Sequence, residues 1–248
     1  MAANFVRISN QRIDTSTALG YSAMTVMFWV KATALVAQAV LDKTATIGSE
    51  GWSIRLLADG SFVWRVGGGT INTDAGVYPS AYEVGVWTHL AIRSDFSDDG
   101  EGNIYCENSL VKDGVSQGSQ STLVFSTSLE TITTVRIGRS NLVAEATDNF
   151  GGLLDDVRIY NGRLFDSVGD KQEKTIFGSR GRDTIFRQTG GTGASLQLRY
   201  TFMEGYPGQV MSGAGVVKDL SPNKYDGTPF SSPTWQSSIL TFKKQASL

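Results

Sequence analysis

The stretch MTVMFWVK, residues 24–31, repeats with a period of two. Every second residue from Met24 to Val30 is apolar, so an extended chain would present one continuous apolar face. Similar short runs occur at 4–8, 37–42, 52–56, 62–66, 86–93, 103–111, 132–138, 153–160, 196–202 and 238–242. Many short strands with few helical patterns between them predict an all-β fold, a sandwich of two antiparallel sheets.

The runs at 52–56 and 62–66 lie on either side of Asp59-Gly60. Because Asp-Gly between two alternating runs is typical of a β-hairpin, we expect these runs to pair. Trp52 and Trp64 lie on the apolar faces of the two runs, so both rings are predicted to be in the core.

The composition excludes several classes of protein. The 248 residues include 28 Gly and 5 Pro, a composition that suits many short strands joined by tight turns. The net charge of −2 argues against a nucleic-acid partner, because binding nucleic acid needs a basic face. No run approaches the roughly 20 apolar residues of a membrane span, and the first residues lack the apolar core of a signal peptide. Cys106 is the only cysteine, so no intrachain disulfide can form. We therefore expect synthesis in the cytoplasm.

Four segments resemble the concanavalin A-like jelly roll, in its laminin-G-like branch. They are NFVRIS with MTVMFWVKA (4–9 and 24–32), VWTHLAIR (86–93), IYCENSLVKDG (104–114) and NFGGLLDDVRIYNGRL (149–164), the last being the most specific. The resemblance covers most of residues 1–165. It implies a two-sheet antiparallel sandwich and a lineage rich in glycan-binding and adhesion modules.

The C-terminal segments resemble the opening of the same family. LQLRYTFMEG (196–205) and VVKDLSPNKYDGT (217–228) are similar to its first strand and loop, and ILTFKKQ (239–245) is similar to the segment that normally precedes the counterpart of NFVRI. We infer one circularly permuted domain over 1–248, in which 196–248 completes the sandwich begun at 1–165. The alternative is that 196–248 begins an incomplete second domain.

No catalytic residues are predicted. Gly114–Gly118 fits Gly-x-Ser-x-Gly, but that motif needs a strand-to-helix turn and a downstream histidine, and the only histidine is His89. The resembled glucanases carry a Glu-x-Asp-x-x-Glu strand that places their carboxylates, and the sequence has no such run.

Four residues are candidate calcium ligands. Asp155 shares strand parity with Val157, so its carboxylate points inward if Val157 faces the core, and a buried carboxylate must be hydrogen-bonded or bind a cation. Asp219, Ser221 and Asn223 supply oxygens at alternating positions, as calcium loops do. The resembled family often carries a structural Ca²⁺ that joins this loop to the strand of Asp155. The alternative is a hydrogen-bonded turn without metal.

Aromatic rings in loops are the candidates for stacking on sugars. Four tyrosines outside the clearest strands meet this criterion and are predicted as glycan-binding residues: Tyr78, Tyr82, Tyr206 and Tyr225.

Residues 163–194 form a charged, poorly alternating excursion. Phe165, Phe177 and Phe186 lie among its Arg and Lys residues and must be buried somewhere. They are predicted to anchor an interface with a neighbouring molecule. In the alternative, the segment packs on the flank of the sandwich.

These observations together predict a non-enzymatic structural or adhesive module. We expect a bacteriophage virion component, a capsid decoration or tail-associated protein made in the host cytoplasm. It would dock on a viral or surface protein assembly, with a homo-oligomer as one form, and would bind cell-surface glycans. One alternative is a free lectin-like carbohydrate-binding protein, cytoplasmic or released non-classically. A second is a glycoside hydrolase of the same fold.

Overall fold

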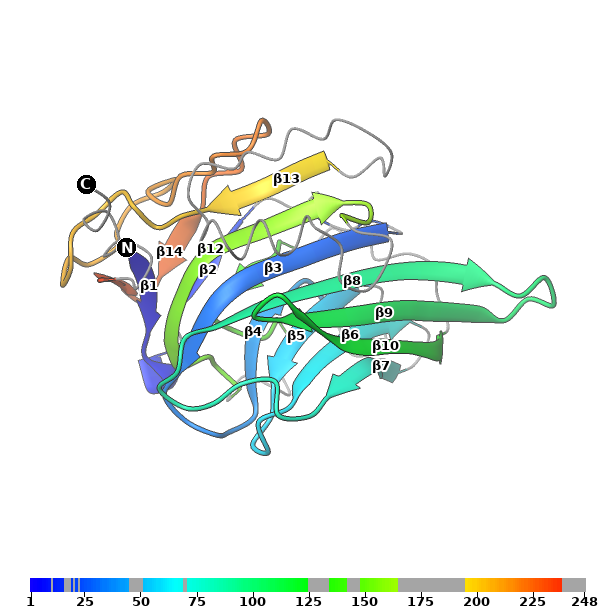
Figure 1. Cartoon of the computed structure of the whole chain (residues 1–248). Helices are drawn as coiled ribbons and strands as arrows, with labels where there is room; N and C mark the ends of the chain where they lie inside the picture. The colour runs from blue at the N-terminus through cyan, green and yellow to red at the C-terminus, as the bar shows by residue number, and fades with distance from the viewer. Residues whose placement is uncertain are drawn as a thin grey trace, which may run out of the picture.

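The chain forms a two-layer β-sandwich (Figure 1). The computed structural model describes residues 1–9, 11–15, 19, 21, 23–44, 51–68, 71–124, 134–141, 148–164 and 195–237. In this part of the chain every strand pairing between named strands is antiparallel. The predicted all-β antiparallel sandwich is therefore confirmed.

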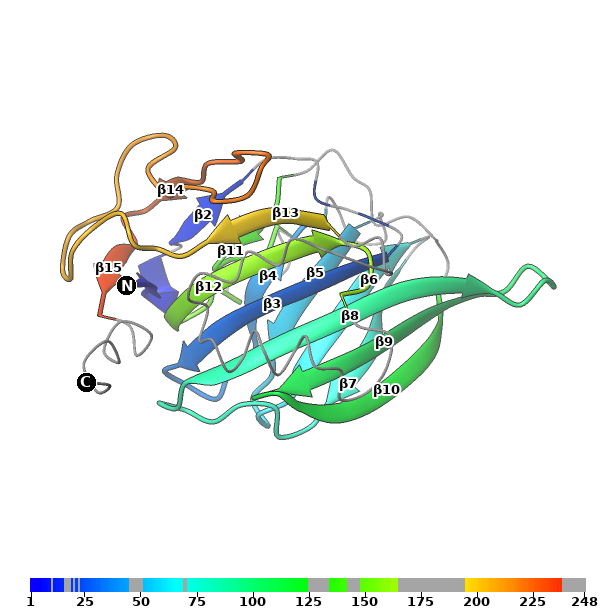
Figure 2. The same ribbon diagram turned by 45° about the horizontal axis from the view of Figure 1, so that its top comes forward.

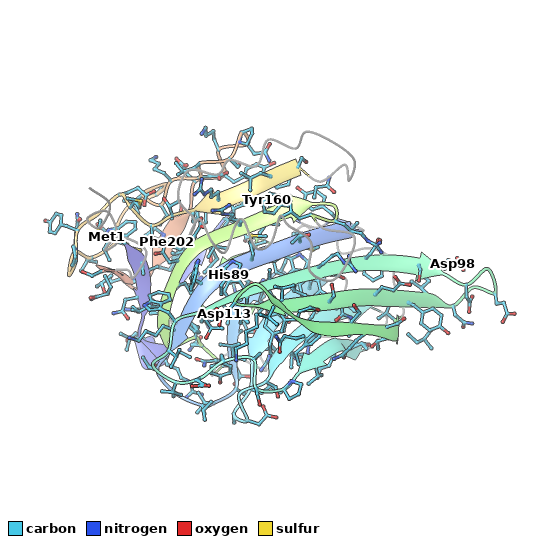
Figure 3. The ribbon with its side chains drawn as sticks, in the orientation of Figure 1. Met1, His89, Asp98, Asp113, Tyr160 and Phe202 are labelled. Atoms are coloured by element: carbon cyan, nitrogen blue, oxygen red, sulfur yellow. The ribbon has the colours of Figure 1, made fainter. Side chains whose placement is uncertain are left out.

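The first sheet, sheet A, has the strand order β10-β9-β8-β3-β12-β1-β15, and β13 also pairs with β12. Its described strands are β1 (Ala2–Phe5), β3 (Ala23–Ala32), β8 (Thr88–Asp98), β9 (Ile104–Lys112), β10 (Val115–Val124), β12 (Gly152–Asn161), β13 (Ser195–Tyr200) and β15 (Thr234–Gln236). The hairpin of β8 and β9 extends beyond the body of the sandwich, with Asp98 near its tip (Figure 3).

The second sheet, sheet B, has the strand order β14-β2-β11-β4-β5-β6-β7. Its described strands are β2 (Arg12–Asp14), β4 (Gln38–Asp42), β5 (Gly51–Leu56), β6 (Phe62–Gly68), β7 (Ile71–Tyr78), β11 (Arg136–Ile137) and β14 (Thr228–Phe230). A 3₁₀ turn, η1 (Arg7–Ser9), lies between β1 and β2. The expected hairpin is present as β5 and β6, and Gly60 adopts a φ of 84° in its turn.

The core lies between the two sheets and follows the predicted alternation. Met24, Val26, Phe28 and Val30 of β3 all belong to it, none more than 1% exposed. The predicted core tryptophans of β5 and β6 are fully buried and stacked, with ring centroids 5.5 Å apart. Each indole N–H donates to an oxygen, so burial leaves neither donor unsatisfied.

Side chains connect the two sheets where β7 and β10 lie next to each other. The side-chain amide of Gln120 on β10 bonds to the backbone of Val77 on β7. Gln120 Oε1 accepts a hydrogen bond from Val77 N at 3.0 Å, and Gln120 Nε2 donates one to Val77 O at 2.5 Å. Thr122 Oγ1 donates to Ala75 O at 2.8 Å. These contacts occupy backbone groups that an edge strand otherwise exposes to other chains.

The C-terminal strands belong to the same two sheets as the N-terminal ones. In sheet A, β13 pairs with β12, and β15 pairs with β1 so that Trp235 lies opposite Ala3. In sheet B, β14 pairs with β2. Residues 239–245, which carry part of the circular-permutation argument, lie outside the described residues.

A β-bulge in β12 makes the Asp155 side chain point in the direction opposite to the one predicted. Leu154 and Val157 both face the main core, and the pairing with β3 shifts register between Asp155 and Arg158. Asp155 therefore lies opposite Trp29, on the outer face of sheet A, whereas strict alternation predicts that it points inward. The side chain is still 2% exposed, because this part of the outer face is buried too.

The bulge places Asp156 in a buried ionic network. Asp156 has a φ of 44°, and its carboxylate accepts two hydrogen bonds from Arg158, at 3.0 and 2.6 Å, and one from Arg199 of β13, at 3.1 Å. His89 and Trp29 lie nearby on the same face, with ring centroids 5.2 Å apart (Figure 3). Burial lowers the pKa of His89 to about 4; Asp156 acts in the opposite direction, and Arg158 lowers it further.

Removal of residues 196–248 is expected to abolish folding. The deletion takes β13, β14 and β15 out of both sheets and uncovers core residues of β12, β1 and β2. By contrast, a rearranged chain that runs 196–248 and then 1–195 should fold, because Ala2 and Gln236 are already register partners. Both are checked by thermal unfolding followed by circular dichroism. A fragment 1–195 that melts cooperatively at the temperature of the whole chain would contradict the single-domain inference.

Acidification is expected to destabilise the protein through His89. The folded state keeps His89 neutral down to about pH 4, whereas the unfolded chain protonates it near 6.5. Stability is therefore lost as the pH falls between these values, by about 3 kcal/mol in total. Urea unfolding at pH 7 and pH 4.5 measures the loss, and His89→Gln is the comparison. An equal pH dependence in the variant would show that other groups cause it.

Candidate functional site

The loop between β13 and β14 is organised by one buried carboxylate. Asp219, 2% exposed, accepts four hydrogen bonds: from Arg199 N, Ser221 N and Tyr225 N at 2.8 Å each, and from Ser221 Oγ at 2.6 Å. Three of these donors belong to the loop itself, and Arg199 N belongs to β13. The carboxylate thus fixes both the loop conformation and its position on sheet A.

This loop presents polar side chains at the surface beside β13. The amide of the exposed Asn223 donates to Gln197 O at 3.1 Å and to Gln197 Oε1 at 2.9 Å. Tyr21 Oη donates to the same Gln197 Oε1 at 3.1 Å, and Ser221 Oγ lies 2.9 Å from Gln197 O. We call Tyr21, Gln197 and Asn223 the amide cluster. Its members are held in one geometry before any ligand arrives.

The Tyr21 ring of the amide cluster and the Tyr225 ring of the Asp219 loop are only partly covered. Tyr21 and Tyr225 are both half-buried and pack against the main core. Tyr225 is further held because its carbonyl accepts a hydrogen bond from the Tyr200 hydroxyl. Amide groups can bind the hydroxyls of a sugar, and a partly exposed aromatic ring can cover its apolar face.

The calcium expectation meets a different geometry at this loop. Asp219, Ser221 and Asn223 do come together, but each Asp219 oxygen already accepts two hydrogen bonds from protein donors. Asp155 receives a hydrogen bond from Asp156 N at 2.8 Å. Among the described residues, no three Asp, Glu, His or Cys side chains form a metal-binding group. The oxygens around Asp219 therefore fit the hydrogen-bonded turn, the alternative that the sequence left open, better than a cation.

Two of the predicted glycan-binding tyrosines are in the core, which corrects that prediction. Tyr78 is 2% exposed and donates to Asn108 Oδ1 at 2.7 Å; Tyr82 is 3% exposed and donates to Leu57 O at 2.7 Å. Both hydroxyls find partners inside the sandwich, so both rings can be buried. The prediction failed because Tyr78 is the last residue of strand β7, whose polar sequence does not show the alternation expected of a strand.

Tyr206 meets the expectation of exposure. It is 66% exposed in the segment that follows β13, and its N–H donates to Gln209 Oε1 at 3.2 Å. The role of Tyr206 in sugar binding stays a prediction.

The predicted interface anchors Phe165, Phe177 and Phe186 lie outside the described residues. Of the excursion, Arg163 and Leu164 are described: Arg163 forms an ion pair with Asp95 at 2.5 Å, and Leu164 is 3% exposed.

Sequence reasoning missed Tyr21 and Gln197. Gln197 is a polar residue in an otherwise apolar run, LQLRYTF, at the position whose carbonyl faces the Asp219 loop. A polar residue inside a strand that borders a proposed loop site is the signal that could have identified it.

Replacement of Asp219 by Ala is expected to destabilise the fold by a few kcal/mol, because it leaves buried N–H donors without an acceptor. Ca²⁺ and a chelator should each leave the melting temperature of the wild type unchanged, since the carboxylate needs no cation. Calorimetry measures both, and Asp98→Ala, an exposed carboxylate near the tip of the β8–β9 hairpin, is the comparison. A melting temperature that falls with chelator, in protein shown by elemental analysis to carry calcium, would contradict the metal-free geometry.

Three solved structures illustrate the similarity of fold. A Bacteroides ovatus protein, provisionally named as carbohydrate-binding, is 16% identical with a TM-score of 0.57; the match covers 95% of this chain but 61% of that one. A heptameric SAP-like pentraxin from Limulus polyphemus is 14% identical with a TM-score of 0.47, and the match covers 75% of this chain and 85% of that one. The CBM40 of a Ruminococcus gnavus IT-sialidase, solved with α2,3 sialyllactose, is 16% identical with a TM-score of 0.46. That match covers 65% of this chain and 92% of the CBM40.

Sequence comparison supplies the family. No curated protein matches the chain. A family model of the concanavalin A-like lectin/glucanases superfamily, of laminin-G type, matches residues 4–167, which is more than half of the chain. This chain therefore belongs to the concanavalin A-like lectin/glucanases superfamily, in its laminin-G-like branch.

Proposed function

We propose that the chain is a non-enzymatic carbohydrate-binding and adhesive module. The observation that carries the proposal is the amide cluster, in which the Asn223 amide and the Tyr21 hydroxyl are both fixed on Gln197 at the surface beside β13. Membership of a superfamily that includes lectins supports the same function.

The preorganisation of this site suits a binding role. Asn223 is exposed, but its amide nitrogen is fixed by two contacts to Gln197, and Gln197 is fixed by strand β13. A ligand that binds here orders few additional side chains, so less entropy opposes its binding.

Two of the buried carboxylates are unavailable for glycoside hydrolysis. Glycoside hydrolysis generally requires two carboxyl groups that flank the bond to be broken. Asp156 is engaged by two arginines, and Asp42 is fully buried and accepts hydrogen bonds from Thr44 and Ser140. Neither carboxylate is accessible to a polysaccharide.

We also propose that the module docks on a larger protein assembly. The assembly that we expect is a bacteriophage virion. One end of the sandwich exposes Leu35, Val84 and Val86 by 43–48%, and the two loops lie side by side because Gly85 N donates to Ala32 O at 2.9 Å. Clustered apolar side chains at a surface are typical of protein contacts. Detection of the chain in purified particles tests this part.

A glycan array with the purified full chain tests carbohydrate binding. We expect binding to at least one glycan class, and about tenfold weaker binding for Asn223→Ala, from the loss of a directional hydrogen bond and of the fixed geometry. Tyr206→Ala tests the predicted stacking residue in the same assay. Asn103→Ala, at the tip of the β8–β9 hairpin, is the matched exposed asparagine and should bind as the wild type does. A folded wild type that binds no glycan would overturn the proposal.

A further inference from the structure

Three arginines meet on the outer face of sheet B, in a group that we call the arginine cluster. Arg12 lies on β2, Arg136 on the adjacent β11, and Arg139 just beyond the end of β11. Ile13 and Ile137 are register partners and are fully buried, so Arg12 and Arg136 point away from the core. Figure 2 shows β14, β2 and β11 side by side.

One carboxylate, Asp14, serves the whole arginine cluster. Arg12 Nε donates to Asp14 Oδ1 at 3.0 Å, and Arg136 Nε lies 3.7 Å from the same oxygen, too far for a hydrogen bond. Arg139 has no ion pair or hydrogen bond with any residue in the described part of the chain, and the Nε atoms of Arg136 and Arg139 are buried without an acceptor. Among the described residues, the ion pairs of these three arginines are with Asp14 alone.

The electrostatics of Arg139 show the same imbalance. Burial and then the charges of Arg12 and Arg136 lower the pKa of the Arg139 guanidinium, and Asp14 acts in the opposite direction. Asp42 is the register partner of Arg136 on β4, but Thr44 and Ser140 donate to its carboxylate, and burial raises its pKa. No ion pair joins Asp42 to an arginine of the cluster in the described part of the chain.

An exposed aromatic ring borders these charges. Phe230 of β14 is the register partner of Arg12, 40% of its surface is exposed, and the Arg12 Cζ lies 4.1 Å from the ring centroid. Guanidinium groups bind oxyanions by charge-assisted, often bidentate hydrogen bonds. An aromatic ring beside them offers an apolar surface to the C–H face of a pyranose.

From this geometry we propose that Arg12, Arg136 and Arg139 form an oxyanion subsite that takes the carboxylate or sulfate group of an acidic sugar, with Phe230 against the sugar ring. The inference rests on the proposed carbohydrate-binding function and names the class of glycan. Like-charged groups that lie close together repel one another and oppose folding. A bound anion removes that repulsion.

Titration calorimetry with three oligosaccharides of equal length tests the subsite. One probe carries glucuronic acid, the second a sulfate ester, and the third is neutral. The wild type should bind at least one acidic probe about tenfold more tightly than the neutral one, and the preference should shrink as salt rises. The two acidic arms distinguish carboxylate from sulfate as the recognised group.

Arg139→Gln is the decisive variant, because Arg139 contributes no ion pair or hydrogen bond within the described fold. We expect it to lose the preference for the acidic probe while its melting temperature stays equal to or above that of the wild type. Arg65→Gln, on the same face of sheet B but paired with Asp74 at 2.6 Å, is the control and should keep the preference. An equal loss in both variants would mean general charge attraction and would overturn the subsite.

The failures of the two proposals can be told apart. Equal binding of acidic and neutral probes, unchanged in Arg139→Gln, overturns the subsite and leaves the carbohydrate-binding function intact. If no oligosaccharide binds, the melting temperatures of the wild type and of Arg139→Gln are compared in sodium sulfate and in sodium chloride at equal ionic strength. If sulfate raises the melting temperature of the wild type but not that of Arg139→Gln, the oxyanion subsite is supported and the glycan function is overturned. No difference overturns both.

Discussion

The buried carboxylate of Asp156 holds β12, a central strand of sheet A, to the C-terminal strand β13. It lies on β12, which pairs with β3 along one edge and, along the other, with β1 at residues 152–154 and β13 at residues 157–161. The bulge at Asp155–Asp156 lies where the N-terminal partner strand ends and the C-terminal one begins. Because Arg199 of β13 and Arg158 both donate to Asp156, the ion network fixes β13 to β12. Loss of one member would leave a charge buried without compensation.

Alternation in the sequence accounts for most of the fold, because each sheet has one face on a shared core. It identified the strands of the β5–β6 hairpin and the core face of β3. It failed for Asp155, since one extra residue in a strand reverses the direction of every side chain that precedes it, and a bulge carries no residue-level signal in LLDDVRIY. It also failed for Tyr78, where the strand INTDAGVY is too polar to be recognised.

The candidate sites were less predictable than the fold, because they depend on register between distant strands. Asp219 was identified from its loop, but its partner Arg199 lies 20 residues earlier, and Gln197 gains its role only because β13 borders that loop. The arginine cluster brings together residues 12 and 136 through the pairing of β2 with β11. A net charge of −2 describes the whole chain and gives no information about such a local excess of positive charge.

The two groups of charged residues differ in how fully the fold satisfies them. Asp219 accepts four hydrogen bonds from its own loop and strand, so its charge is used within the native structure and its removal should affect stability first. Arg139 makes no such contact in the described chain, and the charges of Arg12 and Arg136 oppose its own while Asp14 favours it. Within the described chain these three guanidinium groups pair with one carboxylate, and a bound anion would add negative charge beside them. The degree to which a charged side chain is satisfied within the fold therefore separates a structural role, as for Asp219, from the ligand-binding role inferred for the arginine cluster.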